Sequence, residues 1–137
     1  MSRMSRRAVP YTPFEGELKK SVVALVSNAG VHLQEGEPFA PEGDTSLRIL
    51  PGGVTGDQLR ITHPHYDHRE ADQDINCVFP IDRLRELAQE GIIGGVASKH
   101  IGLGYSMDLK RVYEENAPQV ADQIERSTAD VVVLSGG

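Results

Sequence analysis

Two apolar runs rich in valine constrain the fold of this chain more than any other feature. The first, "SVVALVSNAG" at 21–30, has no polar alternation before its closing Asn-Ala-Gly and is typical of a strand buried on both faces. The second, "ADVVVLSGG" at 129–137, is an apolar strand followed by Gly136 and Gly137. Strands that are buried on both faces are usually covered by helices. The presence or absence of helical patterns between the two runs therefore indicates whether the fold is α/β.

Two stretches between these runs have the helical period. "PIDRLRELAQEG" at 80–91 places its apolar residues on one face, begins at Pro80 and stops at Gly91. "MDLKRVYEENAPQVADQIERS" at 107–127 also has this period, but Pro118 is expected to break or kink it, which predicts two consecutive helices. Strands that alternate with helices predict an α/β fold, a Rossmann-like sandwich with a largely parallel sheet.

The remaining segments are predicted to be shorter strands and loops. The glycine-, proline- and acid-rich stretch 30–46 is expected to be a long loop, "LRIL" and "QLRIT" to be short strands, and 92–105 to be a strand followed by a glycine-rich loop. Ligands of parallel α/β sheets collect at the carboxyl ends of the strands. The candidate site loops are therefore those that follow Val26, Ile61, Val96 and Leu134.

Length and charge exclude several classes of protein. We expect one α/β domain at 19–137, preceded by a flexible basic tail at 1–18. The net charge of −6 argues against nucleic-acid binding, and neither a secretory signal nor an apolar run of membrane-spanning length is present. The lone Cys77 cannot form an internal disulfide. A cytoplasmic protein without nucleic-acid or membrane partners is expected.

The segment "HPHYDH" raises the question of a metal centre. His63, His65, Asp67 and His68 match the first metal-ligand motif of metallo-β-lactamase-like hydrolases, and they follow a strand-like "LRIT" as that motif does. A binuclear site needs further histidines downstream, and only His100 follows. The favoured interpretation is a metal-free polar loop, and a metal-dependent hydrolase that uses these four residues is the alternative.

A longer pattern contains this segment. From His63 to Tyr105, the elements His-x-His-Tyr-Asp, Asp-x-Asn-Cys-Val-Phe-Pro, Arg-Leu-x-Glu-Leu and Gly-x-Ile-Gly occur in order and at short spacing. Together with 22–39, 43–51 and 129–137, this block resembles the selenoprotein B family of glycine, sarcosine, betaine and D-proline reductases. The resemblance covers nearly all of the chain from about residue 20 onward.

The resemblance implies a component of a reductase that cleaves a C–N bond reductively in substrates of the glycine, sarcosine, betaine or D-proline type. Members of the family place a selenocysteine or cysteine just after a strand like "VVVLS", so the nucleophile is expected after Gly137. Because UGA encodes selenocysteine and is also read as a stop, the domain is expected to be incomplete at its C-terminus and inactive as it stands. The chain itself needs no cofactor; selenocysteine is expected in the full-length product.

The resemblance also implies site residues and partners. The residues expected to orient substrate or assist proton transfer are His63, His65, Asp74 and Asn76, and those expected to bind substrate are Ser135, Gly136 and Gly137. The expected partners are other subunits of the reductase complex, a small amino-acid-like substrate and further copies in an oligomer. A non-catalytic binding subunit is a further alternative.

Overall fold

The central element of the fold is β1 (Val22–Ser27), which lies in the middle of a five-stranded sheet. This computed structural model describes residues 11–137. On one edge, β1 pairs in parallel with β5 (Gly95–Val96) and then with β6 (Lys99–Leu103). On the other edge it pairs in parallel with β7 (Val131–Ser135) along Val23–Ser27. The predicted α/β class with a largely parallel sheet is confirmed.

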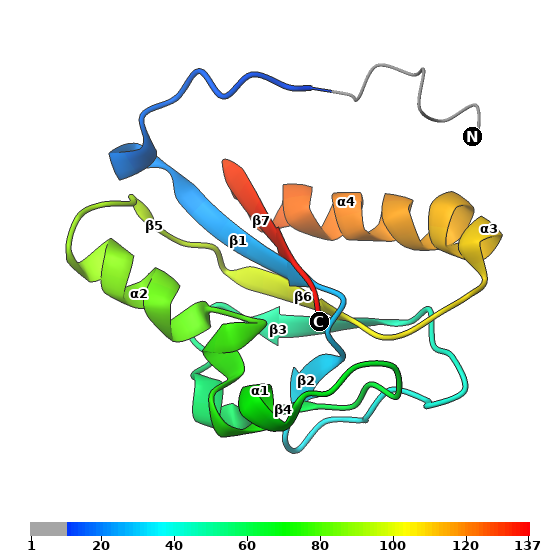
Figure 1. Cartoon of the computed structure of the whole chain (residues 1–137). Helices are drawn as coiled ribbons and strands as arrows, with labels where there is room; N and C mark the ends of the chain where they lie inside the picture. The colour runs from blue at the N-terminus through cyan, green and yellow to red at the C-terminus, as the bar shows by residue number, and fades with distance from the viewer. Residues whose placement is uncertain (1–10) are drawn as a thin grey trace, which may run out of the picture.

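One strand departs from the parallel arrangement. β3 (Leu47–Pro51) pairs antiparallel with β6 and forms the end of the sheet opposite β7 (Figure 1). The finer prediction of a Rossmann-like sandwich remains a prediction.

The valine-rich run at β1 is buried on both faces, as predicted. Val23 and Leu25 pack into the main core together with Leu84 of α2 (Ile81–Gln89). Val26 faces the other side, where it lines an apolar groove with Ile124 of α4 (Ala117–Arg126). Successive side chains of a strand point to opposite faces, so one helix covers each face of the sheet (Figure 1).

The C-terminal helical segment does not break at Pro118. α3 (Leu109–Arg111) continues through a π-helical turn, η5 (Val112–Asn116), directly into α4. Pro118 stands in the first turn of α4 and has no N–H to donate. The wider π turn before Pro118 keeps the chain helical. The proline therefore changes the hydrogen-bond pattern of one continuous helical segment, whereas two separate helices were predicted.

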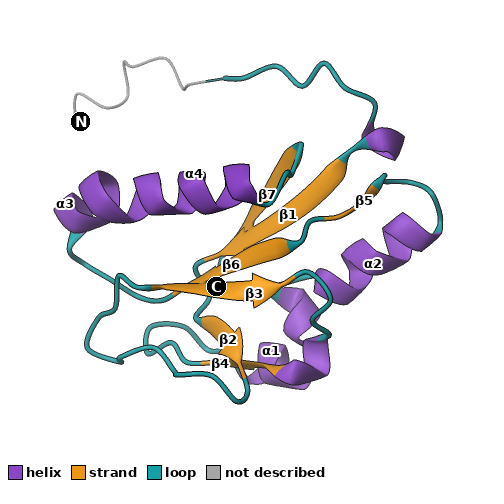
Figure 2. Cartoon of the chain, turned by 180° about the vertical axis from the view of Figure 1, so that it is seen from behind, coloured by secondary structure: helices purple, strands orange, loops and turns teal. Residues whose placement is uncertain are grey.

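A second, two-stranded sheet corrects two expectations about the first half of the chain. β2 (Val31–Leu33) lies inside the stretch predicted to be a loop, and it pairs antiparallel with β4 (Leu59–Ile61), which does not join the main sheet (Figure 2). The buried His32 ties the two strands together. Its Nδ1 donates to the Leu33 carbonyl at 2.8 Å, and its Nε2 lies 2.9 Å from the Thr62 hydroxyl.

The segment 92–105 forms two strands where one was predicted. Two residues separate β5 from β6, and the fully buried His100 is the second residue of β6. Its Nδ1 accepts the backbone N–H of Leu25 at 2.9 Å, in place of a carbonyl of the missing strand pairing. A side chain therefore completes the hydrogen bonding of β1 at this point.

The short elements surround this framework. They are the 3-10 turns η2 (Leu18–Lys20), η3 (Gly56–Gln58) and η4 (Ile75–Cys77), and the helix α1 (Arg69–Gln73). Of the predicted tail at 1–18, residues 1–10 lie outside the described residues, and 11–17 form neither helix nor strand. No helix within 11–137 has the length and apolar character needed to cross a membrane.

Candidate functional site

The carboxyl ends of β1, β6 and β7 lie at one edge of the main sheet, because these three strands are parallel. The residues that follow them are Asn28, Gly104–Tyr105 and Gly136–Gly137. Side chains and backbone at such an edge are free of strand pairing and can face a ligand. The ends of these three strands thus form one side of the candidate site.

The loop after β4 reaches the same edge although β4 belongs to the smaller sheet. Gly30 connects the two sheets: its N–H donates to the Leu103 carbonyl at 3.0 Å, and its carbonyl accepts the Thr62 N–H at 2.9 Å. Gly30 has a φ of +80° and approaches Thr62 and His63 closely, which a side chain would prevent. This link brings the histidine-rich loop to the ends of the strands.

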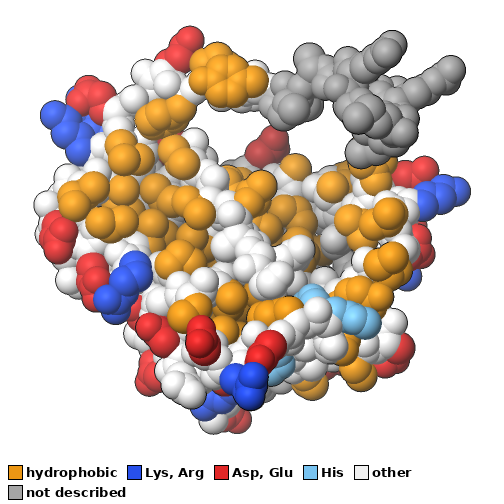
Figure 3. Space-filling view, in the orientation of Figure 1, with side chains coloured by type: hydrophobic (Ala, Val, Ile, Leu, Met, Phe, Trp, Pro, Cys, Tyr) orange, Lys and Arg blue, Asp and Glu red, His pale blue; other side chains and the backbone are white. Residues whose placement is uncertain are grey.

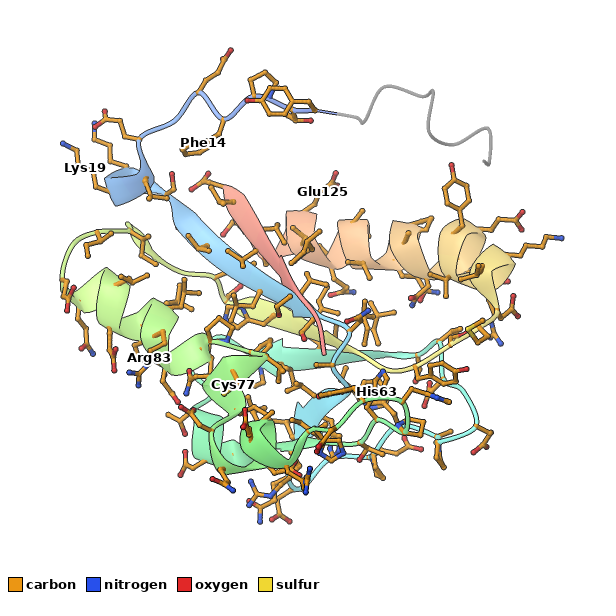
Figure 4. All side chains as sticks on the ribbon, in the orientation of Figure 1. Phe14, Lys19, His63, Cys77, Arg83 and Glu125 are labelled. Atoms are coloured by element: carbon orange, nitrogen blue, oxygen red, sulfur yellow. The ribbon has the colours of Figure 1, made fainter. Side chains whose placement is uncertain are left out.

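Five rings come together there and form what we call the His–Tyr cluster: His63, His65, Tyr66, His68 and Tyr105. The His65 and Tyr105 rings stack with centroids 3.9 Å apart, and the His63 and Tyr66 centroids are 4.8 Å apart. Figure 4 labels His63, and Figure 3 shows histidine side chains at the surface beside apolar groups. The cluster is therefore partly accessible to solvent.

Tyr66 connects the cluster to the end of β7. Its hydroxyl donates to the Ala29 carbonyl at 2.8 Å, and its ring lies against Gly137, where a Cβ atom would come within 2.5 Å of it. Burial, reinforced by the charge of Asp72, raises the pKa of Tyr66 to about 12. Tyr66 thus stays a neutral hydrogen-bond donor at physiological pH.

The backbone after β7 is confined by its neighbours. A Cβ atom on Gly136 would lie 2.9 Å from Oδ1 of Asn28, so glycines at 136 and 137 allow a close approach to both Asn28 and Tyr66. The Ser135 hydroxyl donates to the Val78 carbonyl at 2.7 Å, and the Ser27 hydroxyl donates to the same carbonyl at 3.2 Å. Of the predicted substrate-binding residues, Gly137 thus lies against Tyr66 of the His–Tyr cluster and Gly136 against Asn28, while Ser135 donates its hydroxyl proton to the protein backbone.

His63 is the most electrostatically distinctive member of the cluster. Its Nδ1 accepts the backbone N–H of His65 at 3.2 Å. Burial lowers the pKa of His63, and the nearby positive charges of His65 and His68, when protonated, lower it further. The imidazole of His63 is therefore held in its neutral form.

Asp74 and Asn76, the other two predicted site residues, belong to a separate network. The Asn76 side chain donates to Asp74 at 2.9 Å and to Asp82 at 3.0 Å, and it accepts the N–H of Asp82 at 3.0 Å. Hydrogen bonds from the side chain and backbone of Asn76 lower the pKa of Asp74. No hydrogen bond within 11–137 joins this network to the His–Tyr cluster; it fixes the start of α2 to η4.

The four predicted metal ligands are not arranged around a common point. Both oxygens of Asp67 pair with Arg69, whose hydrogen bonds lower the pKa of Asp67, and His68 Nδ1 lies 2.8 Å from Asp72. Within the described part of the chain, no three His, Cys, Asp or Glu side chains are placed to hold a metal ion. The geometry gives no support to the hydrolase alternative.

Three residues at this edge were absent from the predicted site: Asn28, Tyr66 and Tyr105. Asn28 directly follows a buried parallel strand, and Tyr105 ends the glycine-rich stretch after β6, so the rule about strand ends could have indicated both. Tyr66 lies inside the histidine motif, and it was overlooked because the motif was interpreted through its possible metal ligands.

Comparisons with known proteins agree with the sequence resemblance. A family model described as glycine/sarcosine/betaine reductase selenoprotein B matches residues 45–136. The chain belongs to this family. Among curated relatives, the D-proline reductase subunit gamma of Acetoanaerobium sticklandii is 41% identical over 128 residues, which cover 93% of this chain.

Two further relatives belong to related complexes. The glycine reductase complex component B subunit gamma of Symbiobacterium thermophilum is 28% identical over 93% of this chain. The sarcosine reductase complex component B subunit beta of Peptoclostridium acidaminophilum is 28% identical over 79% of this chain. The chain spans 53% of the D-proline reductase relative and 31% and 27% of these two. No solved structure matches the chain.

Proposed function

We propose that the chain is the part of an amino-acid reductase subunit that presents the nucleophile, within a cytoplasmic multi-subunit complex. The observation that carries the proposal is the position of Gly136 and Gly137, which follow a parallel strand and lie between Asn28 and the His–Tyr cluster. A selenocysteine or cysteine placed after Gly137 would enter this site, and ligands of parallel sheets bind at such edges. A Rossmann-like sheet is part of this proposal.

The proposed reaction is a reductive cleavage of a C–N bond. The selenolate or thiolate attacks the substrate carbon, a new bond to carbon forms, and the C–N bond breaks as the amine takes the electron pair and a proton. A second thiol then attacks the selenium or sulfur atom, and the carbon leaves with the electron pair and takes a proton. An external dithiol reduces the resulting Se–S or S–S bond.

D-proline is the first candidate substrate, because the D-proline reductase relative has 41% identity against 28% for the glycine and sarcosine reductase relatives. Cleavage of its Cα–N bond yields 5-aminopentanoate.

The test uses the full-length subunit in its native complex, with dithiothreitol as reductant. D-proline, glycine, sarcosine and betaine are supplied in parallel, and products are measured by mass spectrometry. We expect 5-aminopentanoate from D-proline. Absence of a reduced product from all four substrates, with the complex intact by size-exclusion chromatography, would contradict the proposal.

A second test addresses the nucleophile. The coding sequence after the Gly137 codon should continue with an in-frame TGA or cysteine codon and a further cysteine codon close behind. Mass spectrometry of the native protein should then find selenium or a reactive thiol in the corresponding peptide. A coding sequence with neither codon at this place would remove the nucleophile from the proposal.

A further inference from the structure

The tautomer of His63 is fixed by the backbone. The N–H of His65 can only donate, so the Nδ1 atom that lies 3.2 Å from it must carry a lone pair and no proton. A neutral imidazole has one N–H, which must then be on Nε2. His63 accordingly offers its neighbours a donor and has no second lone pair with which to take up a proton from a substrate.

The Nε2–H of His63 has no acceptor among the described residues. Two carboxylates that follow His63 in the sequence are already paired, Asp67 with Arg69 and Asp72 with His68. Tyr105, whose ring centroid is 5.9 Å from that of His63, also has a hydroxyl with no partner among the described residues. Donors without acceptors favour an anionic or oxygen-rich ligand.

We propose that His63 binds the carboxylate of an amino-acid ligand through its Nε2–H, as a positioning hydrogen-bond donor and not as a proton-accepting base. This inference deepens the proposed function and rests on it for the identity of the ligand. The lowered pKa of His63 agrees with it, because a group held neutral remains a donor of fixed geometry. The role resembles that of any preorganised donor whose orientation is set before the ligand arrives.

The experiment measures binding, independently of reductase activity. The full-length subunit, labelled with ¹⁵N in its histidines, is titrated with D-proline and with D-prolinamide, which keeps the ring and the amine and lacks the carboxylate. Long-range ¹H–¹⁵N correlation spectra report the tautomer of His63, and the shift of its Nε2–H signal reports binding. We expect the Nε2–H tautomer in the free protein and a shift with D-proline alone.

Matched variants separate a donor from a base. His63→Gln retains an N–H donor and should bind D-proline within a few-fold of the wild type. His63→Ala should bind about tenfold more weakly or worse, the usual effect of losing a hydrogen bond to a charged group. Lys110→Ala, an exposed change on α3 outside the candidate site, is the control and should bind as the wild type does.

Any of the following results would overturn the inference: an Nδ1–H tautomer, an equal response to D-prolinamide, or His63→Gln binding as weakly as His63→Ala. A lack of any D-proline-dependent shift at His63 would also overturn it. If carboxylate binding is found while none of the four substrates is reduced, the inference stands and the proposed function fails.

Discussion

The ring of Tyr66 lies directly against Gly137, close enough that even a methyl group on residue 137 would come within 2.5 Å of it. This contact joins the histidine-rich loop to the end of β7, although the two segments are 71 residues apart in the sequence (137 − 66). The Tyr66 hydroxyl anchors the ring by donating to Ala29, which follows β1. Tyr66 therefore holds together three segments that form the candidate site.

Removal of the Tyr66 hydroxyl should lower stability modestly. Tyr66→Phe keeps the ring and loses one half-buried hydrogen bond, which costs about 1 kcal/mol in the free energy of unfolding. Tyr113→Phe is the control, because Tyr113 is 80% exposed and its hydroxyl has no partner within 11–137. Urea denaturation of both variants measures the difference; equal midpoints would show that the Ala29 contact contributes nothing.

Protonation of His100 should make the fold sensitive to acid. Burial, with the charge of Arg85, lowers the pKa of His100 from 6.5 to about 4. The unfolded chain therefore takes up a proton at higher pH than the folded chain does, and stability is full above pH 6.5 and falls as the pH drops toward 4. The loss reaches about 3 kcal/mol for this group.

His100→Asn isolates this contribution. The Asn Oδ1 can replace Nδ1 as acceptor for the Leu25 N–H but does not titrate. The variant should be less stable at every pH because it leaves a cavity, and its free energy of unfolding should change less between pH 7 and pH 4 than that of the wild type. Parallel slopes for the two proteins over this range would refute the assignment.

The network around Asn76 should affect stability more than chemistry. Asn76→Ala removes hydrogen bonds to Asp74 and Asp82 at the start of α2, and it should cost about 2 kcal/mol. Gln73→Ala, an exposed change in the same segment, should stay within about 0.5 kcal/mol of the wild type. An Asn76→Ala protein of unchanged stability with reduced activity would instead restore Asn76 to the role in substrate orientation first predicted.

The exposed edge of the sheet should make the 137-residue chain associate. Among the described strands β7 pairs with β1 alone (Figure 1), and its apolar residues Val132, Val133 and Leu134 are 37%, 40% and 76% exposed. Open edge strands with apolar side chains pair readily with other chains. Leu134→Lys should reduce association in sedimentation velocity, while Leu109→Lys, also exposed but on α3, should not. A monodisperse monomer at all concentrations would contradict this expectation.

Sequence patterns predicted the parts of the fold whose burial is periodic. β1 and α2 are strongly patterned, and their type and position follow directly from valine content and helical spacing. β2 was missed because a strand of three residues carries too little pattern. Its pairing with β4 and the His32–Thr62 hydrogen bond, which spans 30 residues, are long-range contacts. The division of 92–105 into β5 and β6 was also missed. There the Nδ1 atom of His100 accepts the N–H of Leu25 in place of a backbone carbonyl, a long-range contact that no local pattern indicates.

The candidate site residues also fall into those that the sequence predicted correctly as neighbours and those whose partners it did not reveal. His63 and His65 were selected by their motif, and Ser135, Gly136 and Gly137 by their place after a strand, and the fold brings these two groups together through Tyr66. Asp74 and Asn76 were selected by the next element of the resemblance, Asp-x-Asn-Cys-Val-Phe-Pro. Asn76 is directed toward α2 because Asp82, six residues further along the chain, is its hydrogen-bond partner, and Asp74 pairs with Asn76. Short spacing in sequence could not reveal that choice of partner.

The most direct test of the proposed site is the activity of His63 variants in the complete complex. Full-length subunit carrying His63→Ala, His63→Gln or the exposed control change Lys110→Ala is assembled with its partners, and D-proline-dependent oxidation of dithiothreitol is followed with product analysis. We expect His63→Ala to lose about a hundredfold in kcat/KM, His63→Gln to retain most of the activity, and Lys110→Ala to match the wild type. Wild-type activity in the His63→Ala complex would show that the His–Tyr cluster is not the site of the reaction.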